Sequence, residues 1–201
     1  MDLELISDND GKILVEMARS SVVEYLQNHT RIVDDEFNSK FNVNAGVFIT
    51  INKNGSLRGC IGYPLPIKKL SDGIIDSAIA AATNDPRFPE INVSELNEIV
   101  FEVTVLTQPT EINVNRHEDY LSTIKIGRDG LIVENQHSSG LLLPQVPKEY
   151  GWNVEQFLSH TSEKAGLDKN AWKDNDTKVS RFEGIIFKEE HPNGKVVREI
   201  L

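Results

Sequence analysis

The chain contains a single cysteine, Cys60, and its neighbours are residue types that can change the reactivity of a thiol. Cys60 lies in the segment LRGCIG, residues 57–62, which we expect to form a β-strand. Because side chains alternate along a strand, Arg58, Cys60 and Gly62 should share one face. A nearby guanidinium favours the thiolate and lowers the pKa of a cysteine from about 8.5. Gly59 and Gly62 would admit a ligand or another backbone, so the segment predicts a reactive or ligand-contacting thiol.

A structural role for Cys60 stays open on the same residues. Free cysteine is among the most buried residue types and usually packs as a small hydrophobe. The strand expected over residues 99–106 carries Glu102 on its polar face, so Arg58 could simply pair with Glu102 across the sheet. If Cys60 is a nucleophile, then Arg58 lowers its pKa, and Glu102 or a histidine manages the proton. Cys60, Arg58 and Glu102 are therefore the candidate catalytic residues.

Two further segments offer candidate ligand-binding residues. In the sequence NDPRFP, Asp85 and Pro86 could form a turn, or Arg87 could grip a carboxylate or phosphate with its forked guanidinium. In GLLLPQV, Gln145 could present its amide in a cleft as both donor and acceptor. A buried strand that leaves the sheet at Pro144 is the simpler interpretation of that second segment. The candidate ligand-binding set is Gly59, Gly62, Asp85, Arg87 and Gln145.

The sequence predicts no metal site and no cofactor. No pair of its five histidines has the i, i+4 spacing of a helical metal site, and there is no Cys-x-x-Cys motif. A G-x-G-x-x-G or Walker-type loop is also missing. His137 or His160 could still act as the base for Cys60 if the fold brings them together.

The elements that must position these residues mix helices and strands without strict βαβ alternation, which favours an α+β fold. The predicted helices cover residues 8–26, capped by Asp8 or Asp10, residues 67–83, and a segment from the capping-box pair Asn153 and Gln156 to Gly166. The predicted strands and hairpins are Gly46–Ile51 with Ser56–Gly62 around an Asn-Gly turn, Ile99–Leu106 in the centre of the sheet, Lys125–Val133 turning at Asp129-Gly130, Leu141–Leu143, and a closing hairpin around Pro192-Asn193-Gly194. We therefore expect a mixed or antiparallel sheet with flanking helices.

Composition excludes several classes of protein. With 201 residues, 39% of them hydrophobic, the chain can bury a core without disulfides. No apolar run reaches the length of about 18 residues that a membrane span needs, and the acidic start does not resemble a signal peptide. One free cysteine suits a reducing compartment, so we expect a cytoplasmic protein that does not enter membranes. The net charge of -10 disfavours nucleic acid as a partner.

The chain resembles the AMMECR family, which is named after a human contiguous-deletion syndrome that includes Alport syndrome and elliptocytosis. The resemblance rests on six ordered blocks: LRGCIG at 57–62, AATNDPRFP at 81–89, FEVTVL at 101–106, IGRDGLIVE at 126–134, GLLLPQV at 140–146 and KAGL at 164–167. It implies one AMMECR-type domain over residues 1–201, with an α+β main part, a smaller packed lobe and a cleft near the LRGCIG strand. Some prokaryotic relatives are associated with Memo-type and radical SAM proteins, so these are candidate partners in a modification pathway.

The resemblance assigns no activity, and whether the protein is an enzyme stays open. The first hypothesis is a cleft in which Cys60 and Arg58 meet a small or peptide-like ligand, with Cys60 as nucleophile if a reaction follows. The second is a non-enzymatic binding or adaptor module. The third, a factor linked to transcription, replication, repair or translation, is the weakest because of the acidic charge.

Overall fold

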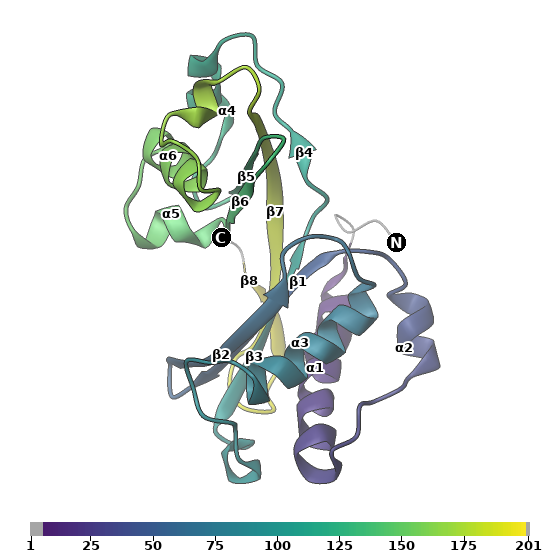
Figure 1. Ribbon diagram of the computed structural model, residues 1–201. Coiled ribbons are helices and arrows are strands. Elements are labelled where there is room, and N and C mark those ends of the chain that lie inside the picture. Colours follow the sequence, from purple (N-terminus) through teal and green to yellow (C-terminus); the bar gives the residue numbers. More distant parts are fainter. Residues whose placement is uncertain (1–5, 200–201) are drawn as a thin grey trace. The chain divides into compact units, whose positions relative to one another are not determined.

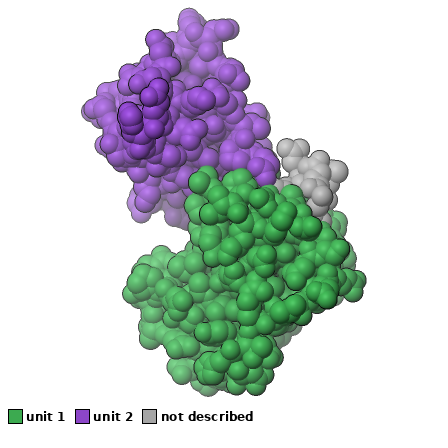
Figure 2. All heavy atoms as spheres, turned by 45° about the vertical axis from the view of Figure 1, so that its right-hand side comes forward, with its two compact units in different colours: residues 1–107, 185–200 green, residues 108–184, 201 purple. Residues whose placement is uncertain are grey.

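The structure is a computed structural model in which residues 6–199 are described, and it divides into two compact units. Within the described residues, unit 1 comprises 6–107 and 185–199, and unit 2 comprises 108–184 (Figure 2). Unit 1 is therefore built from two stretches of chain, and in the sequence all residues of unit 2 come between these two stretches. Each unit has its own cluster of buried hydrophobic side chains.

Unit 1 contains a sheet in the order β2-β1-β3-β7, with β8 paired to β7. Its strands are β1 (Gly46–Lys53), β2 (Ser56–Tyr63), β3 (Ile99–Leu106), β7 (Lys178–Glu189) and β8 (Val196–Glu199). The β1–β2 hairpin turns at Asn54 and Gly55, which have φ of 51° and 77°. Positive φ at both central residues is what a tight hairpin requires, and Asn-Gly supplies it at low cost. The predicted hairpin, the predicted central strand β3 and the predicted closing hairpin β7–β8 are confirmed.

Helices α1 (Asp8–Asn28) and α3 (Leu70–Thr83) lie beside the same sheet, with the short α2 (Asp35–Lys40) and the 3-10 turn η2 (Val93–Glu95) completing unit 1 (Figure 1). Both long helices pack on β1 or β3 and on each other. Ile49, Ile51 and Phe101 are fully buried in this core. Alternation then directs the residues between them, such as Thr50 and Glu102, to the opposite face of the sheet.

Two helix boundaries differ from the sequence prediction. The N-cap of α1 is Ser7, whose hydroxyl accepts from the Asp10 amide, while Asp10 closes a capping box in return. Asp8 and Asp10 are thus first-turn residues, where their charge favours the helix dipole. Helix α3 begins at Leu70, not Ile67, because the chain bends at residues 64–66 and is still extended at the N-cap, Lys69. Ile67 lies outside the helix and is 73% exposed.

A buried ion pair ties the two stretches of unit 1 together. Arg19 of α1 donates two hydrogen bonds of 2.6 Å to the carboxylate of Glu189 in β7. The same guanidinium donates to the carbonyl oxygens of Leu96 and Ile99, and Glu189 accepts the amide of Phe101. Both the guanidinium of Arg19 and the carboxylate of Glu189 therefore have further hydrogen-bond partners. Such partners offset the free-energy cost of removing an ion pair from water.

Unit 2 contains a smaller antiparallel sheet that includes the first part of β7. Its other elements are β4 (Thr110–Glu111), η3 (His117–Asp119), α4 (Tyr120–Thr123), β5 (Asp129–Glu134), β6 (Ser139–Leu142), α5 (Gln145–Glu149), α6 (Val154–Lys164) and η4 (Ala171–Lys173). Strand β5 pairs with both β6 and β7. Leu131, Val133 and Phe157 form its core with Trp172 and neighbouring residues. The Asn153–Gln156 capping box of α6 and the positive φ of Gly166 after it are confirmed.

One prediction for unit 2 was wrong. Lys125–Val133 is not a hairpin, because Asp129 and Gly130 are the first residues of β5 and pair with Glu183 and Phe182 of β7. The Asp129 carboxylate is buried, where it accepts the Lys125 amide at 2.8 Å and an ion pair from Arg128. The short strand expected over Leu141–Leu143 is present as β6, which ends at Leu142 just before Pro144, and Gln145 opens α5.

The α+β class, the antiparallel sheet and the flanking helices are confirmed, whereas the expected cleft stays a prediction. Among residues 6–199, none of the helices combines the length and the apolar character that crossing a lipid bilayer requires.

Candidate functional site

Strand β2 contains a β-bulge at Arg58, and the bulge changes the direction of the Arg58 side chain relative to the sheet. In the pairing with β1, Ile51 lies opposite Gly59 and Asn52 lies opposite Leu57, so no residue of β1 lies opposite Arg58. A bulge re-aims the side chains of the strand around the extra residue. The simple alternation that placed Arg58 beside Cys60 therefore does not hold at this position.

The guanidinium of Arg58 is occupied by the segment that precedes β3. It donates to the two carboxylate oxygens of Glu95 at 3.0 and 3.2 Å, and to the carbonyl oxygens of Pro89 and Glu90. The hydrogen bond from Arg58 is the main reason that the pKa of Glu95 falls to about 2. Arg58 thus pairs with Glu95 and not with Glu102, and these contacts favour a structural role in which it holds residues 89–95 against β2.

The glycines of the segment are explained by close packing of protein backbone. A Cβ on Gly59 would collide with the carbonyl oxygen of Ala81, near the C-terminal end of α3. A Cβ on Gly62 would collide with the carbonyl oxygen of Val47 on β1 and with the ring of Phe48. Both glycines permit a close backbone approach, as the sequence suggested, and in each case the approaching atoms belong to unit 1 itself.

Asp85 and Arg87 cover the outer edge of β2 at Cys60. The Asp85 carboxylate accepts the Cys60 amide at 2.8 Å, and Arg87 donates from Nη2 to the Cys60 carbonyl oxygen at 3.2 Å. Arg87 also binds the Asp85 carboxylate through Nε at 2.9 Å and Nη2 at 2.7 Å. These hydrogen bonds from Arg87 hold the pKa of Asp85 far below its usual range, against the opposing effect of burial. The pair satisfies backbone groups that an edge strand would otherwise leave open.

Only Asp85 of this pair is buried. Its side chain is 2% exposed, whereas that of Arg87 is 53% exposed. Asp85 raises the pKa of the Arg87 guanidinium, and Cys60 makes a smaller contribution in the same direction. Arg87 is therefore the cation beside Cys60, and part of its guanidinium remains accessible to a ligand.

Cys60, Thr50 and Glu102 form a row across three neighbouring strands. Thr50 of β1 lies opposite Cys60 of β2 in one register and opposite Glu102 of β3 in the other. The Thr50 hydroxyl donates to Cys60 Sγ over 3.6 Å. Because the amide and carbonyl of Cys60 point outward to Asp85 and Arg87, Thr50 and Cys60 are a non-hydrogen-bonded pair, in which side chains lie closest.

The carboxyl at the end of this row has a perturbed pKa. Burial raises the pKa of Glu102, and the negative charge of Glu199 adds to the rise. Lys188 and a hydrogen bond with Thr50 act in the opposite direction. Lys188 is itself paired with Glu199 at 2.8 Å, so its charge is shared between two carboxylates. A carboxylate whose pKa is raised is a stronger base than an ordinary glutamate.

The arrangement of the row suits a proton transfer between Cys60 and Glu102 through the Thr50 hydroxyl. A hydroxyl can accept one proton while it donates its own, so Thr50 can connect two groups that do not touch. Thr50 was not among the residues chosen from the sequence. Aligning the two strands about the Asn-Gly turn without a bulge places Gly59 opposite Thr50, so the sequence alone does not bring Thr50 to Cys60.

The remaining candidates belong to unit 2. The side-chain oxygen of Gln145 is buried in α5 and has no hydrogen-bond partner within the described chain. The ring of His160 stacks on Trp152 at 4.0 Å and its Nδ1 lies 2.9 Å from Glu163, while His137 is exposed in the turn after β5. No group of three or more His, Cys, Asp or Glu side chains in residues 6–199 is arranged to hold a metal ion.

Comparisons with known proteins agree on one family. The sequence model of the AMMECR1 family matches residues 15–187. A protein of Methanothermobacter thermautotrophicus is 46% identical over 186 residues, which are 92% of this chain and 97% of the relative. Protein MJ0810 of Methanocaldococcus jannaschii is 44% identical over 201 residues, 99% of this chain and 100% of the relative. The crystal structure of the uncharacterized protein PH0010 from Pyrococcus horikoshii matches with a TM-score of 0.85 at 44% identity, covering 98% of this chain and 99% of that one.

Proposed function

The chain belongs to the AMMECR1 family, and we propose that its unit 1 binds a small or peptide-like electrophile at the Cys60 end of β2, where Cys60 attacks it as a nucleophile. The row Cys60–Thr50–Glu102 carries this proposal, because it joins the single thiol to a carboxyl of raised pKa through one hydroxyl. A nucleophile, a proton path and a base, each in contact with the next, are the parts that thiol catalysis needs.

In the proposed step, the Thr50 hydroxyl first rotates from its hydrogen bond to Cys60 Sγ so that it donates to Glu102. The thiol proton then passes to the Thr50 oxygen while the Thr50 proton passes to the Glu102 carboxylate. The thiolate of Cys60 then forms an S–C bond with the ligand, whose leaving group departs with the electron pair of the broken bond. The proton stays on Glu102 until it is returned to the leaving group or to water. Glu102 must be ionised to act in this way, so the step should become faster as pH rises through its pKa.

Arg87 is the residue that we assign to ligand binding. Its guanidinium is half exposed beside Cys60, so it can donate to a ligand carboxylate or carbonyl while Asp85 holds the other donors. The structure supports a different role for Arg58, Gly59 and Asp85, which shape the strand and its edge. Mutation of these three residues should affect folding first.

The test is the rate at which iodoacetamide alkylates Cys60 in the folded protein. In this reaction an S–C bond forms and iodide leaves. Thr50→Val removes the hydroxyl at nearly constant volume, and Glu102→Gln removes the base. Each should slow alkylation at neutral pH by about tenfold or more, since general base assistance commonly contributes a factor of about 100 or more. Glu90→Gln, an exposed glutamate whose side chain is outside the row, serves as the matched control and should leave the rate unchanged.

Two outcomes would overturn the proposal. Alkylation that begins only when the protein unfolds would make Cys60 a packing residue and favour a non-enzymatic binding module. Equal rates in the wild type, Thr50→Val and Glu102→Gln would show an accessible thiol without a proton path. Circular dichroism of each variant would confirm that it remains folded.

A further inference from the structure

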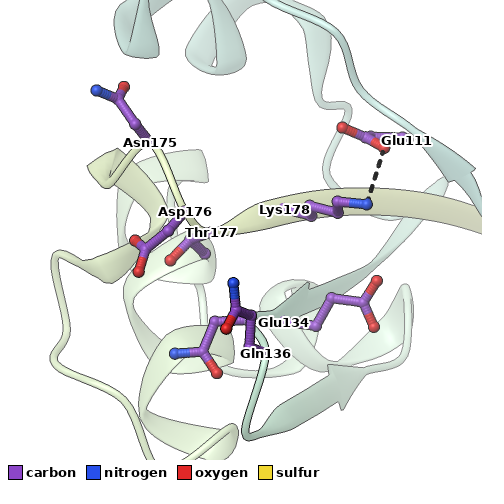
Figure 3. Close-up of a pocket in the computed structure, with 8 residues that line it drawn as sticks. Glu111, Glu134, Gln136, Asn175, Asp176, Thr177 and Lys178 are labelled. Carbon is purple, nitrogen blue, oxygen red and sulfur yellow. Dashed lines mark ion pairs between the residues drawn. The ribbon is translucent and has the colours of Figure 1, made fainter.

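Unit 2 contains a pocket of about 590 Å³ that is separate from every residue assigned above (Figure 3). Its lining comes from the ends of β4 and β5, the turn after β5 and the loop that leads into β7. The residues that matter for its chemistry are Glu111, Glu134, Gln136, Asp176, Thr177 and Lys178. The volume lies within the range of about 300–1,000 Å³ that is usual for sites of small molecules.

Strand pairing places three charged side chains in a row along this pocket. Glu134 of β5 lies opposite Lys178 of β7, and Glu111 of β4 is paired with the residue two positions after Lys178. The neighbouring residues Val133 and Val179 are fully buried in the unit 2 core, so these charged residues occupy the other face of the sheet. The ammonium of Lys178 lies 4.0 Å from the Glu111 carboxylate, and that pair is close to neutral.

Two carboxylates of the pocket have no such compensation. Within residues 6–199, neither Glu134 nor Asp176 forms an ion pair or a side-chain hydrogen bond. With Glu111 offset by Lys178, the pocket therefore carries two uncompensated negative charges. A concave surface of one sign concentrates ligands of the opposite sign.

A largely buried threonine in the same wall has a hydroxyl without a partner in the described chain. Thr177 is 9% exposed, and in the described part of the chain its hydroxyl makes no hydrogen bond, although its amide donates to Asp174. A hydroxyl that lines a pocket without a protein partner can accept a hydrogen bond from a ligand. Gln136 adds a side-chain amide at the opposite side of the loop. This second observation indicates a ligand that donates hydrogen bonds as well as carrying positive charge.

From this combination we infer that the unit 2 pocket binds a linear polyamine, with ammonium groups on Glu134 and Asp176 and a further N–H donor on the Thr177 hydroxyl. The two carboxylates come from different elements, β5 and the loop before β7. One flexible chain with several ammonium groups can reach both within a single pocket. A bare metal ion suits the site less well, because the Lys178 ammonium lies in the middle of the row.

The experiment is calorimetric titration of the full chain with spermidine at two salt concentrations. Glu134→Gln and Asp176→Asn should each weaken binding by about fivefold or more, since each removes one charged hydrogen-bond acceptor. Thr177→Val should weaken it by a smaller factor. Glu118→Gln changes the net charge equally at an exposed position outside the pocket lining and should leave the affinity unchanged. Shifts of backbone amide resonances should be confined to residues 134–136 and 175–178.

Several results would overturn the inference. Absence of binding would do so directly, as would equal weakening in Glu118→Gln, which would indicate general attraction to an acidic protein. A lysine tripeptide has the same charge as spermidine. If it bound as tightly as spermidine, the pocket would not be selective for a free polyamine. Thermal unfolding of each variant separates loss of binding from loss of fold.

Discussion

Arg87 donates a hydrogen bond to the carbonyl oxygen of Cys60 at 3.2 Å, whereas Arg58, only two residues from Cys60 in the chain, makes its ion pair with Glu95. From its position in the sequence, Arg58 was expected to lie beside the thiol, but the structure has Arg87 there. Arg58 connects β2 to the segment before β3, and Arg87 stands beside the thiol. Mutations at the two positions should therefore have different consequences.

Replacement of Arg58 by Ala should lower the stability of the fold. It removes two hydrogen bonds to Glu95 and leaves the carbonyl oxygens of Pro89 and Glu90 without their donor. Both side chains of the ion pair are less than 15% exposed, at 13% and 14%. We expect a loss of about 2–4 kcal/mol in the free energy of unfolding, measured with urea.

The matched control for Arg58→Ala is Arg116→Ala. Arg116 pairs with Asp119 across a surface where its side chain is 75% exposed. Such pairs contribute about 0–1 kcal/mol, so this variant should remain close to the wild type. If both arginine variants unfolded at the same urea concentration, the structural role of Arg58 would be disproved.

The pairing of Glu95 with Arg58 should make the fold sensitive to acid. The pKa of Glu95 is lowered to about 2 in the folded protein, below its value of about 4.3 in an unfolded chain. The stability that this gives is present above about pH 4.3 and is lost as pH falls through 2. Glu95→Gln lacks this titration, so the stability difference between wild type and variant should be constant down to about pH 4.3 and then shrink towards pH 2.

Urea unfolding at a series of pH values would measure that difference. The carboxyl of Asp85, whose pKa is also depressed, titrates in both proteins and so cancels in the comparison. A difference that stayed constant across the acid range would contradict the ion pair.

Substitution of Gly59 by Ala should be far more damaging than substitution of Gly55. An added Cβ at Gly59 meets the backbone carbonyl of Ala81, which cannot move without shifting α3. At Gly55 the surrounding space is open, and the only cost is the positive φ of 77°. We expect Gly55→Ala to cost about 1 kcal/mol and Gly59→Ala at least about 3 kcal/mol, as measured by thermal unfolding. Similar melting temperatures for the two variants would rule out the close approach of α3.

Glu102→Gln should stabilise the protein at neutral pH. Because the folded pKa of Glu102 is raised above its unfolded value, the protonated form contributes stability that is complete below about pH 4.3 and is lost as pH rises through the folded pKa. Glutamine is neutral throughout, so the variant should match the wild type in acid and exceed it near pH 7. Each unit of pKa displacement corresponds to about 1.4 kcal/mol, so the size of the gain measures the displacement.

If the stability difference between Glu102→Gln and the wild type did not change with pH, burial of the Glu102 charge would be refuted. A gain in stability combined with slower alkylation of Cys60 would be the usual sign of a functional residue that is retained at a cost to the fold.

The sequence predicted most of unit 1 because its local signals agree with its tertiary structure. Asn54-Gly55 specifies the hairpin turn, and the β-branched run of β3 suits a central strand. The Asp129-Gly130 signal failed for a tertiary reason. The Asp129 side chain is held by backbone and arginine donors in the interior, so a turn-forming pair became the start of a strand.

The candidate site was predicted only in part. Composition and spacing identified Cys60, Asp85, Arg87 and Glu102, which the structure places in one neighbourhood of unit 1. The bulge at Arg58 could not be seen, because alternation assumes one partner for each residue. Thr50 was missed because a threonine in a strand is ordinary until the residues on the two adjacent strands are known.

The interrupted course of unit 1 has a consequence for biosynthesis. On the ribosome, all of residues 108–184 emerge before β8 and the last part of β7, so unit 2 can fold while unit 1 still lacks strands. Until Glu189 is made, the guanidinium of Arg19 has no carboxylate to neutralise it, and Phe187 is missing from the core. The N-terminal part of unit 1 can therefore complete its fold only after the C-terminal residues have been synthesised. An early stop codon would leave the hydrophobic core of unit 1 incomplete.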